Sequence, residues 1–490
     1  MQRPNILIIY TDQQRWDALG VNGNPDIQTP NLDRLAQESV NFDHYFVQNP
    51  VCMPSRASFL TGQYPSKLGI THMGVPLPEG TITLPKFLRN YGYHSANIGK
   101  LHFLPHANRD HRIPHPGYGF DHLEIADEPG PYEDAYRAWV RHKKPEQLNK
   151  ISAGLPPTAA EWYRIMRVED TVIHPTVNQT ENGGRFDFKG AIPFPGDDDV
   201  TYSAFVAEQT LNYLEHRPTN QPFLCIASFY SPHSPWIAPQ RFLDLYAPDS
   251  LTLPTFPPEI DAQRPKDGTV DELYSDAQLR SAHHGYYTMV TEVDYYVGQI
   301  LDRLEETGLA EDTIVVFTSD HGEWLGEHLR YGKGYPGHDC VSRVPLLVRM
   351  PKKMKGAASG IRCEELVEGV DVIPTLLECA GIQIPPHLQG RSLYPILMPI
   401  KGREQEESSK LAPKPALMEF TGWKMLRSTK YRYVVHDDGR EFLYDLEQPM
   451  GEYHDVASNN SYSEALNDMR YQLIQRVVRI ERPIPKSWTY

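Results

Sequence analysis

Two short apolar runs decide the fold: Asn5-Ile-Leu-Ile-Ile-Tyr10 near the start of the chain and Thr313-Ile-Val-Val-Phe-Thr318 far downstream. Both are rich in β-branched and aromatic side chains, which is typical of strands buried on both faces of a sheet. Asp12 follows the first run and Asp320 follows the second. Because ligand sites in parallel sheets lie beyond the carboxyl ends of the strands, we expect these two carboxylates to share one edge.

Strand and helix signals alternate along the rest of the chain. Further strands are predicted near Ser95–Ile98 and Phe223–Phe229. Helices are predicted at Asn31–Glu38, Thr83–Tyr91 and Leu279–Thr307, the last from an apolar face formed by Met289, Val293, Val297, Ile300 and Leu304. This alternation predicts an α/β fold with a large, mostly parallel sheet flanked by helices.

The domain organisation is read from changes in composition. Residues 1–400 are expected to form the main domain, with a long elaboration over about 105–199 that is rich in Pro, Gly and His. The polar, Pro-punctuated stretch Met398–Pro415 is a plausible linker. Residues 401–490 then predict a smaller α+β domain with a hairpin at Tyr431–His436 and Glu441–Leu446 and a helix at Ser463–Ile480.

Composition limits the classes of function. The net charge of −15 argues against a general role on nucleic acid or an anionic membrane, because both would repel the protein. The five cysteines are scattered and include no CxxC pair, which fits a reducing compartment. Asn5–Tyr10 is too short for a signal-peptide core or a membrane span, so we expect a cytoplasmic protein. The sequence leaves the oligomeric state open.

One cysteine stands in a distinctive segment, Cys52-Met-Pro-Ser-Arg56-Ala-Ser-Phe-Leu-Thr-Gly62. Alone, the segment can be read as an ordinary cysteine before a helix N-terminus, with Pro54 in the first turn. Its surroundings favour a specific interpretation, because further motifs accompany it in a fixed order. They are Pro4-Asn5 with Asp12-Gln13, Thr29-Pro-Asn-Leu-Asp33, Gly99-Lys100-Leu-His102, Ser231-Pro-His233-Ser-Pro235, Asp320-His321-Gly322, Lys333, Arg343-Val-Pro345, Asp371-Val-Ile-Pro-Thr-Leu-Leu377 and Tyr444-Asp-Leu446.

In this order and type the motifs resemble the formylglycine-dependent sulfatases of the alkaline phosphatase superfamily. The resemblance covers nearly the whole chain and implies a sulfuric ester hydrolase acting on a small anionic ester. It also implies that a maturation enzyme recognises Cys52-Met-Pro-Ser-Arg56 and oxidises Cys52 to formylglycine.

The resemblance further implies one divalent metal ion bound by Asp12, Gln13, Asp320 and His321, with the modified Cys52 side chain as another oxygen ligand. Carboxylate and amide oxygens favour Ca²⁺, whereas His321 leaves Mn²⁺ open. The family more often has aspartate where Gln13 stands and asparagine where His321 stands, so the identity of the metal stays open. The alternative for Asp12 and Asp320 is helix capping at strand-to-helix turns.

The family's chemistry suits the substrate. One hydroxyl of the hydrated formylglycine attacks sulfur, and the second collapses to the aldehyde and expels sulfate. By resemblance, Arg56 supports the diol, His102 takes the proton during the collapse, and Lys100 and Lys333 hold the sulfate oxygens. Either His233 or Lys333 protonates the leaving oxygen, a task for a group that titrates near neutrality.

Other basic residues have weaker support. In the segment Pro105–His122, Arg109, Arg112 and His115 are candidates for substrate recognition, with a solvated loop as the equal alternative. A second metal site there is disfavoured, because its histidines lack zinc-like spacing with cysteines. His328 is read equally as support for the metal ligands or as a structural residue.

Three other functions compete with a sulfatase. A phosphonate monoester or phosphodiester hydrolase of the same superfamily would keep Cys52 and the metal site, and the pair Gln13 and His321 is compatible with it. Lys100 and His102 favour a sulfate monoester instead, because a monoester exposes more charge at that position. An inactive relative that only binds ligands, and a thiol hydrolase that uses Cys52 directly, are the remaining alternatives.

Overall fold

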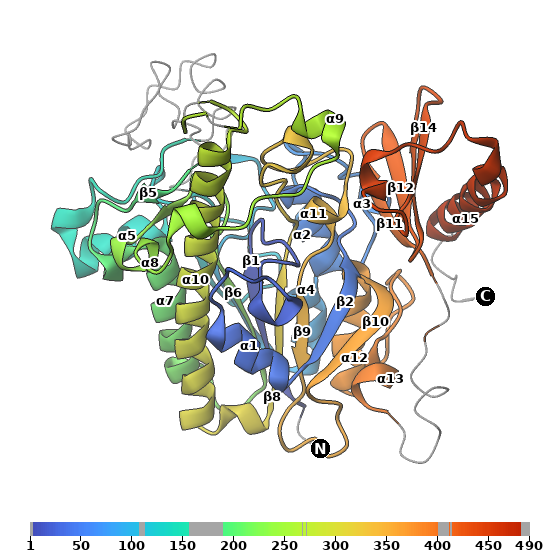
Figure 1. Ribbon diagram of the computed structural model, residues 1–490. Coiled ribbons are helices and arrows are strands. Elements are labelled where there is room, and N and C mark those ends of the chain that lie inside the picture. Colours follow the sequence, from blue (N-terminus) through green and yellow to red (C-terminus); the bar gives the residue numbers. More distant parts are fainter. Residues whose placement is uncertain are drawn as a thin grey trace, which may run out of the picture.

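The computed structural model describes residues 3–106, 113–155, 190–266, 268–270, 272–399, 411 and 414–481. A large twisted sheet lies at the centre with helices on both faces, and a smaller antiparallel sheet with its own helix lies beside it (Figure 1). The α/β class and the smaller α+β unit predicted from the sequence are therefore confirmed.

The central sheet has eight strands, and most neighbours run parallel. Only β9 runs antiparallel to the strands on either side of it. The two apolar runs form neighbouring central strands. In spatial order the strands are β10 (Ile361–Glu368), β2 (Val40–Phe46), β9 (Leu346–Arg349), β8 (Thr313–Ser319), β1 (Asn5–Thr11), β6 (Phe223–Ser228), β3 (His94–Gly99) and β4 (His122–Ile125).

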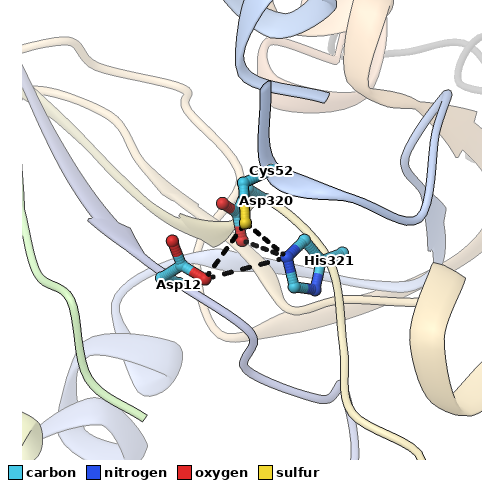
Figure 2. A group of neighbouring side chains, drawn as sticks. All are labelled: Asp12, Cys52, Asp320 and His321. Atoms are coloured by element: carbon cyan, nitrogen blue, oxygen red, sulfur yellow. Dashed lines mark hydrogen bonds and ion pairs between the residues drawn. The ribbon is translucent and has the colours of Figure 1, made fainter. Parts of the chain in front are cut away.

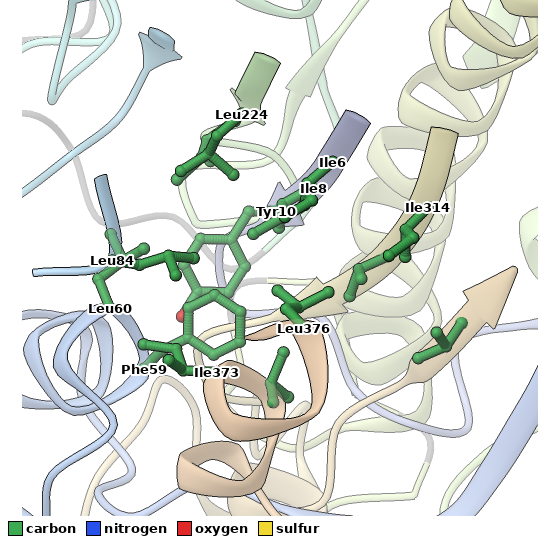
Figure 3. Packing of buried hydrophobic residues seen from close by; sticks show 14 of the residues in the cluster. Ile6, Ile8, Tyr10, Phe59, Leu60, Leu84, Leu224, Ile314, Ile373 and Leu376 are labelled. Carbon is green, nitrogen blue, oxygen red and sulfur yellow. The ribbon is translucent and has the colours of Figure 1, made fainter. Parts of the chain in front are cut away.

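Both faces of β1 are buried, because successive side chains of a strand point to opposite faces. Ile6, Ile8 and Tyr10 belong to one hydrophobic cluster, and Leu7 and Ile9 belong to another. Figure 3 shows the first cluster, in which β1 packs against side chains of α2 and α12. An apolar run without alternation is the sequence pattern that such a strand requires.

Different helices cover the two faces of the sheet. The face that carries Ile6 packs against α2 (Cys52–Thr61), α4 (Leu84–Leu88), α12 (Val372–Cys379) and α13 (Tyr394–Leu397). The opposite face packs against α1 (Pro30–Gln37), α5 (Ala135–Lys143), α7 (Tyr202–His216) and α10 (Asp276–Glu306). Shorter elements are α3 (Pro65–Leu68), α8 (Gln240–Leu243), α9 (Pro258–Asp261), α11 (Asp339–Ser342), β5 (Ile192–Pro193) and β7 (Ile237–Ala238).

The long helix α10 confirms the clearest helical pattern in the sequence. Ser275 caps it by accepting a hydrogen bond from the Gln278 amide. Its predicted apolar face is buried throughout. Most of that face packs on the central sheet, whereas Met289, nearer the N-terminus of the helix, lies in a separate cluster with Trp236 and Tyr286.

The smaller unit is a four-stranded antiparallel sheet covered by α15 (Ser463–Glu481). Its strands, in order, are β11 (Ala416–Phe420), β12 (Trp423–Arg427), β13 (Tyr431–His436) and β14 (Glu441–Asp445). The predicted hairpin is β13–β14 and the predicted helix is α15, so both are confirmed. Arg432 joins this sheet to the larger unit, because its guanidinium contacts Asp339 and Glu452 at 2.5 Å each.

The predicted elaboration over 105–199 contains regular structure that the sequence pattern did not indicate. β4 pairs with β3 at the edge of the central sheet, and α5 packs against α7. Residues 107–112 and 156–189 of this stretch lie outside the described residues, as does most of the expected linker. The domain limits at residues 400 and 401 stay a prediction.

All five cysteines are buried and unpaired, which agrees with the absence of a disulfide framework in the sequence. Within the part of the chain that the structure describes, every helix is too short or too polar to cross a lipid bilayer.

Candidate active site

Two buried carboxylates lie side by side at the carboxyl ends of β1 and β8. These strands pair in parallel with Thr11 opposite Ser319, so the residues that follow, Asp12 and Asp320, leave the sheet together. The Asp320 amide still donates to the Thr11 carbonyl at 3.3 Å. Neither aspartate is exposed to solvent. The shared edge expected from the sequence is therefore present.

Cys52 is the first residue of α2, whose ten residues are all buried. The helix N-terminus faces the edge where β1 and β8 end and thus carries partial positive charge toward it. The preceding turn is fixed by Asn49, whose side chain accepts a hydrogen bond from the Val51 amide at 3.1 Å. An anionic group bound at Cys52 would lie in this field.

Figure 2 shows the cluster that these elements form: Asp12, Cys52, Asp320 and His321. One potential ligand atom from each residue lies within 4.8 Å of the others. The His321 Nε2 atom is 3.2 Å from Cys52 Sγ and 3.6–3.7 Å from a carboxylate oxygen of each aspartate. His321 Nδ1 lies 2.8 Å from the Gly322 carbonyl and must donate to it, so Nε2 presents its lone pair to the cluster.

Gln13 completes the donor set. Its backbone is in the left-handed region (φ 71°), and its amide donates to Asp320 Oδ1 at 3.0 Å. Its side-chain Nε2 donates to Glu323, whereas Oε1 is buried without a hydrogen-bond partner among the described residues. A buried amide oxygen without a partner is costly unless something else binds it. Two carboxylates, one amide oxygen and one imidazole fit a divalent cation.

Arg56 binds both aspartates from one turn inside α2. Its Nε donates to Asp320 Oδ2 at 2.7 Å and its Nη2 to Asp12 Oδ2 at 3.2 Å. Its Nη1 donates to the Lys100 carbonyl and to Ser228 Oγ, each at 3.0 Å. The guanidinium also lies 4.8 Å from the ring of Tyr10. Arg56 therefore holds the two carboxylates in place. The role expected from the sequence, support of the diol, did not include these contacts.

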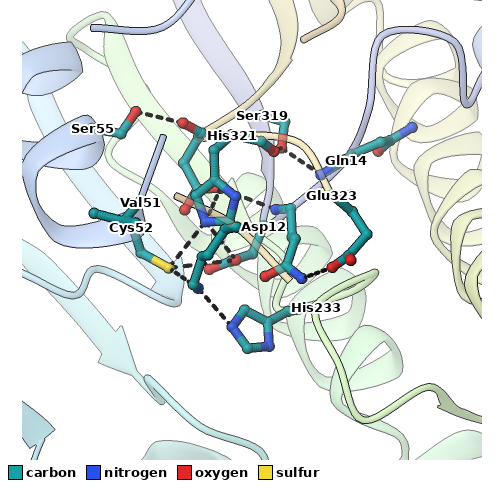
Figure 4. Close-up of polar contacts among 12 residues, drawn as sticks. Asp12, Gln14, Val51, Cys52, Ser55, His233, Ser319, His321 and Glu323 are labelled. Carbon is teal, nitrogen blue, oxygen red and sulfur yellow. Dashed lines mark hydrogen bonds and ion pairs between the residues drawn. The ribbon is translucent and has the colours of Figure 1, made fainter. Parts of the chain in front are cut away.

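Lys333 contacts both Cys52 and His233. Figure 4 shows His233 among the polar residues around Cys52. The Lys333 Nζ atom is 2.6 Å from Cys52 Sγ and 2.8 Å from His233 Nε2. His233 Nδ1 lies 2.6 Å from the Ser234 carbonyl, to which it must donate, so His233 Nε2 accepts the hydrogen bond from Lys333. Lys333 is thus the hydrogen-bond donor of this pair, and His233 Nε2 is the acceptor.

Lys100 and His102 follow β3, as the sequence predicts. Lys100 Nζ forms an ion pair with Asp12 Oδ2 at 2.8 Å and lies 4.9 Å from the Tyr230 ring. Asp127 fixes the turn, because its carboxylate accepts hydrogen bonds from the amides of Leu101 and His102 at 3.0 and 2.8 Å. Both ring nitrogens of buried His102 lack a partner among the described residues, and the ring packs against another imidazole, that of His106, with centroids 4.1 Å apart.

Burial and charge together set the protonation states. Burial and the charge of Asp12 raise the pKa of the Cys52 thiol to about 11, although Lys333 and Lys100 act against this. Burial alone would raise the pKa of Asp12, but the charges of Lys100 and Arg56 hold it well below its usual value. Burial and the neighbouring charges of His106 and Lys100 lower the pKa of His102 well below its ordinary value, so the imidazole is neutral.

Two of the remaining sequence candidates, His115 and His328, contact residues other than those of the cluster. Arg109 and Arg112 fall outside the described residues. His115 Nδ1 donates to the Pro116 carbonyl at 2.8 Å, and the ring lies against Tyr118. The His328 ring stacks on Tyr453 with centroids 3.8 Å apart, so it packs the metal-motif loop against the C-terminal unit, which favours the structural alternative.

Sequence reasoning missed three residues that organise the site. Tyr230 follows the predicted strand Phe223–Phe229, so its place at a strand end was a usable signal. Glu323 lies one residue beyond Gly322, and its local sequence does not indicate that its carboxylate accepts a hydrogen bond from the distant Gln13 side chain. Asp127 gave little signal, because the strand before it, β4, is a half-buried edge strand of mixed composition.

Comparisons with known proteins agree with this geometry. The family model described as "Sulfatase" matches residues 4–382, and the model "N-sulphoglucosamine sulphohydrolase, C-terminal" matches residues 326–479. The chain is 29% identical to an arylsulfatase of Clostridium perfringens, covering 97% of this chain and 94% of the relative. It is also 29% identical to a choline-sulfatase of Rhizobium meliloti, covering 93% and 83%.

Among solved structures, the chain resembles a phosphonate monoester hydrolase of Agrobacterium radiobacter, with a TM-score of 0.76, 25% identity and coverage of 98% and 96%. This likeness extends over both units and places the fold in the alkaline phosphatase superfamily. The site at Cys52, the family models over most of the chain and the curated relatives agree with one another. The chain belongs to the sulfatase family and is a sulfuric ester hydrolase.

Proposed function

We propose that this protein hydrolyses a sulfate monoester to an alcohol and inorganic sulfate, with formylglycine hydrate formed from Cys52 as the nucleophile. The observation that carries the proposal is the position of Cys52. On one side it meets the metal-type donors Asp12 and His321, and on the other it meets the Lys333 ammonium at 2.6 Å. A tetrahedral anion bound there would lie beside the nucleophile, between the metal-binding residues and the positive charge of Lys333.

Maturation has to precede folding in this proposal. Cys52 is 1% exposed and begins a helix whose residues are all buried. An enzyme that oxidises the thiol to an aldehyde must reach the Cβ–Sγ bond, which the folded chain covers. The Cys52-Met-Pro-Ser-Arg56 segment is therefore presented to the maturation enzyme while it is still extended.

In the first half of the reaction, one hydroxyl of the hydrated aldehyde attacks sulfur and the bond from sulfur to the alcohol oxygen breaks. Lys100 and Lys333 hold sulfate oxygens, and Arg56 keeps Asp12 and Asp320 in position. Lys333, whose ammonium donates to residue 52 and to His233, protonates the leaving alcohol oxygen and then takes up the proton of the attacking hydroxyl, so the step neither gains nor loses a proton. His233 accepts a hydrogen bond from the ammonium and so orients it. We therefore assign the general-acid role to Lys333.

In the second half, the remaining hydroxyl loses its proton, the carbon–oxygen bond to the sulfate breaks, and the aldehyde re-forms. Neutral His102 accepts that proton. Its two ring nitrogens have no partner among the described residues, so either is available. Asp127 positions His102 through the two backbone hydrogen bonds of the turn. Water then hydrates the aldehyde for the next cycle.

Asp12, Gln13, Asp320 and His321 would hold a divalent ion, Ca²⁺ or Mn²⁺, which neutralises sulfate oxygens and polarises the diol when bound. We expect exhaustive chelation to abolish turnover, because two buried carboxylates and the nucleophile would lose their shared counter-charge. Activity of the treated enzyme, followed by separate additions of Ca²⁺ and Mn²⁺, measures this and identifies the metal. Rates unaffected by chelation would contradict the ligand assignment.

The alternative reaction is hydrolysis of phosphonate monoesters or phosphodiesters, which the fold likeness to such a hydrolase keeps in view. The ion pair of Lys100 with Asp12 places a cation where a monoester carries most of its charge, which favours sulfate. A panel of one aryl alcohol as its sulfate ester, phosphate diester and phosphonate monoester tests the choice. We expect the highest kcat/KM for the sulfate ester, and a phosphonate or diester that exceeds it would reverse the assignment.

A further inference from the structure

A cavity adjoins the residues of the candidate active site. It has a volume of about 380 Å³ and is lined by the start of α7, the segments 151–153 and 192–195, Tyr230 with Ser231, and Met289 with Glu292 of α10. This volume is in the range of small-molecule sites. Its walls are mainly apolar and aromatic, including the side chains of Tyr136 and Tyr202.

The cavity shares a wall with the catalytic groups. Tyr230 lines the cavity, and its hydroxyl lies 2.9 Å from His233 Nδ1. Its ring lies 4.9 Å from Lys100 Nζ. The cavity and the groups proposed to hold the sulfate therefore meet at Tyr230.

Glu292 is the unusual residue of the cavity. It is 2% exposed, and its Oε1 atom has no hydrogen-bond partner among the described residues. Such an oxygen is costly to bury and calls for an explanation, such as a ligand that donates to it. Glu292 is a residue of α10. Figure 1 shows α10 as the long helix beside the central sheet.

Burial, more than the neighbouring charges, sets the pKa of Glu292. Burial raises its pKa to about 7, although hydrogen bonds from Thr201 and Ser203 act against this. Arg241 lowers the pKa, and Asp198 raises it. The other ionisable groups nearby are Tyr136 and Tyr296, which interact with Glu292 electrostatically, and Lys150 in the lining.

The chemistry of the cavity selects a class of ligand. The three tyrosine hydroxyls are engaged by backbone carbonyls, Tyr136 with Val200, Tyr202 with Ala126 and Tyr230 with Ser234, so their rings remain to contact a ligand. Aromatic rings and a carboxylate attract an organic cation. A protonated amine also donates a hydrogen bond, which a second anion or a purely apolar ligand would not supply to Glu292.

We propose that the cavity receives the alcohol half of the sulfate ester and that Glu292 binds a protonated amine carried by that alcohol. This inference rests on the proposed function for its link to turnover. The amine site itself is tested by binding alone, without a reaction.

The first test is calorimetric titration of the full chain with phenethylamine. Glu292→Gln keeps the shape of the side chain and removes its charge, so we expect affinity to fall at least tenfold. Glu306→Gln, an exposed position on the same helix, is the matched control and keeps wild-type affinity. Undetectable binding to the wild type, or equal binding to wild type and Glu292→Gln, overturns the proposal.

A second measurement needs no variant. With a pKa of about 7 for Glu292, amine affinity should rise about tenfold between pH 6 and pH 8 as the carboxyl ionises. Neutral 2-phenylethanol should show no such rise. A phenethylamine affinity that is flat over this range overturns the assignment of Glu292, whether or not the variant folds.

The third measurement links the cavity to turnover. The sulfate esters of tyramine and of 4-ethylphenol differ in the amine alone. We expect the wild type to prefer the tyramine ester, and the ratio of the two kcat/KM values to fall at least tenfold in Glu292→Gln. Amine binding without an ester preference overturns the placement of the alcohol. Hydrolysis of neither ester would instead count against the proposed function, which separates the two failures.

Discussion

Cys52→Ala should have no measurable turnover and a native fold. The variant has no side chain that can become an aldehyde, and loss of a covalent nucleophile in a hydrolase costs on the order of 10⁶ in kcat. We expect the variant to keep its native fold, because the cysteine side chain is small and the helix that it begins is buried along its whole length. Initial rates with an aryl sulfate and a thermal melting curve measure both properties.

Cys363→Ala is the matched control for this variant. Cys363 is another buried cysteine, in β10 at the edge of the central sheet. It should keep wild-type turnover, which shows that removing a buried thiol is not itself inactivating. Turnover retained by Cys52→Ala would place the nucleophile elsewhere and end the proposed mechanism.

Lys100→Ala should lower kcat/KM for a sulfate ester by ~10²–10³, the usual cost of removing one group that stabilises charge in the transition state. Lys100 is 1% exposed, and its ion pair with Asp12 holds the ammonium at the cluster. Steady-state kinetics of the variant measure the loss.

Loss of the partner of Asp12 can also disturb the fold, so two comparisons accompany this variant. Its melting temperature reports the structural part, and Lys67→Ala, at an exposed lysine of α3, reports the effect of removing a surface charge. We expect Lys67→Ala to match the wild type. A loss smaller than about threefold in Lys100→Ala, far below the expected range, would place Lys100 outside the site.

The sequence predicts the fold where side chains are buried on both faces. Asn5–Tyr10 and Thr313–Thr318 stand out because a central parallel strand needs apolar residues at every position. β2 and β10 gave no such signal, since Val40–Phe46 and Ile361–Glu368 mix charged and apolar residues near the edge of the sheet. Their pairing depends on partners far away in the sequence, which local patterns do not encode.

The same limit applies to the candidate site. The motifs supplied the residue types at Cys52, Asp12, Asp320 and His321, and strand ends supplied the shared edge. The motifs did not supply the pairings: Arg56 binding both carboxylates, or Lys333 contacting His233 one hundred positions away. These contacts arise only when four strands of the sheet bring their ends together, so they require the fold.

The account depends most on the chemical state of residue 52. Peptide mass spectrometry of the active enzyme, with the fraction of modified Cys52 compared with specific activity across preparations, measures it directly. The account predicts a peptide in which an aldehyde replaces the thiol and an activity proportional to its fraction. Fully active protein in which every residue 52 is still a cysteine thiol would contradict it.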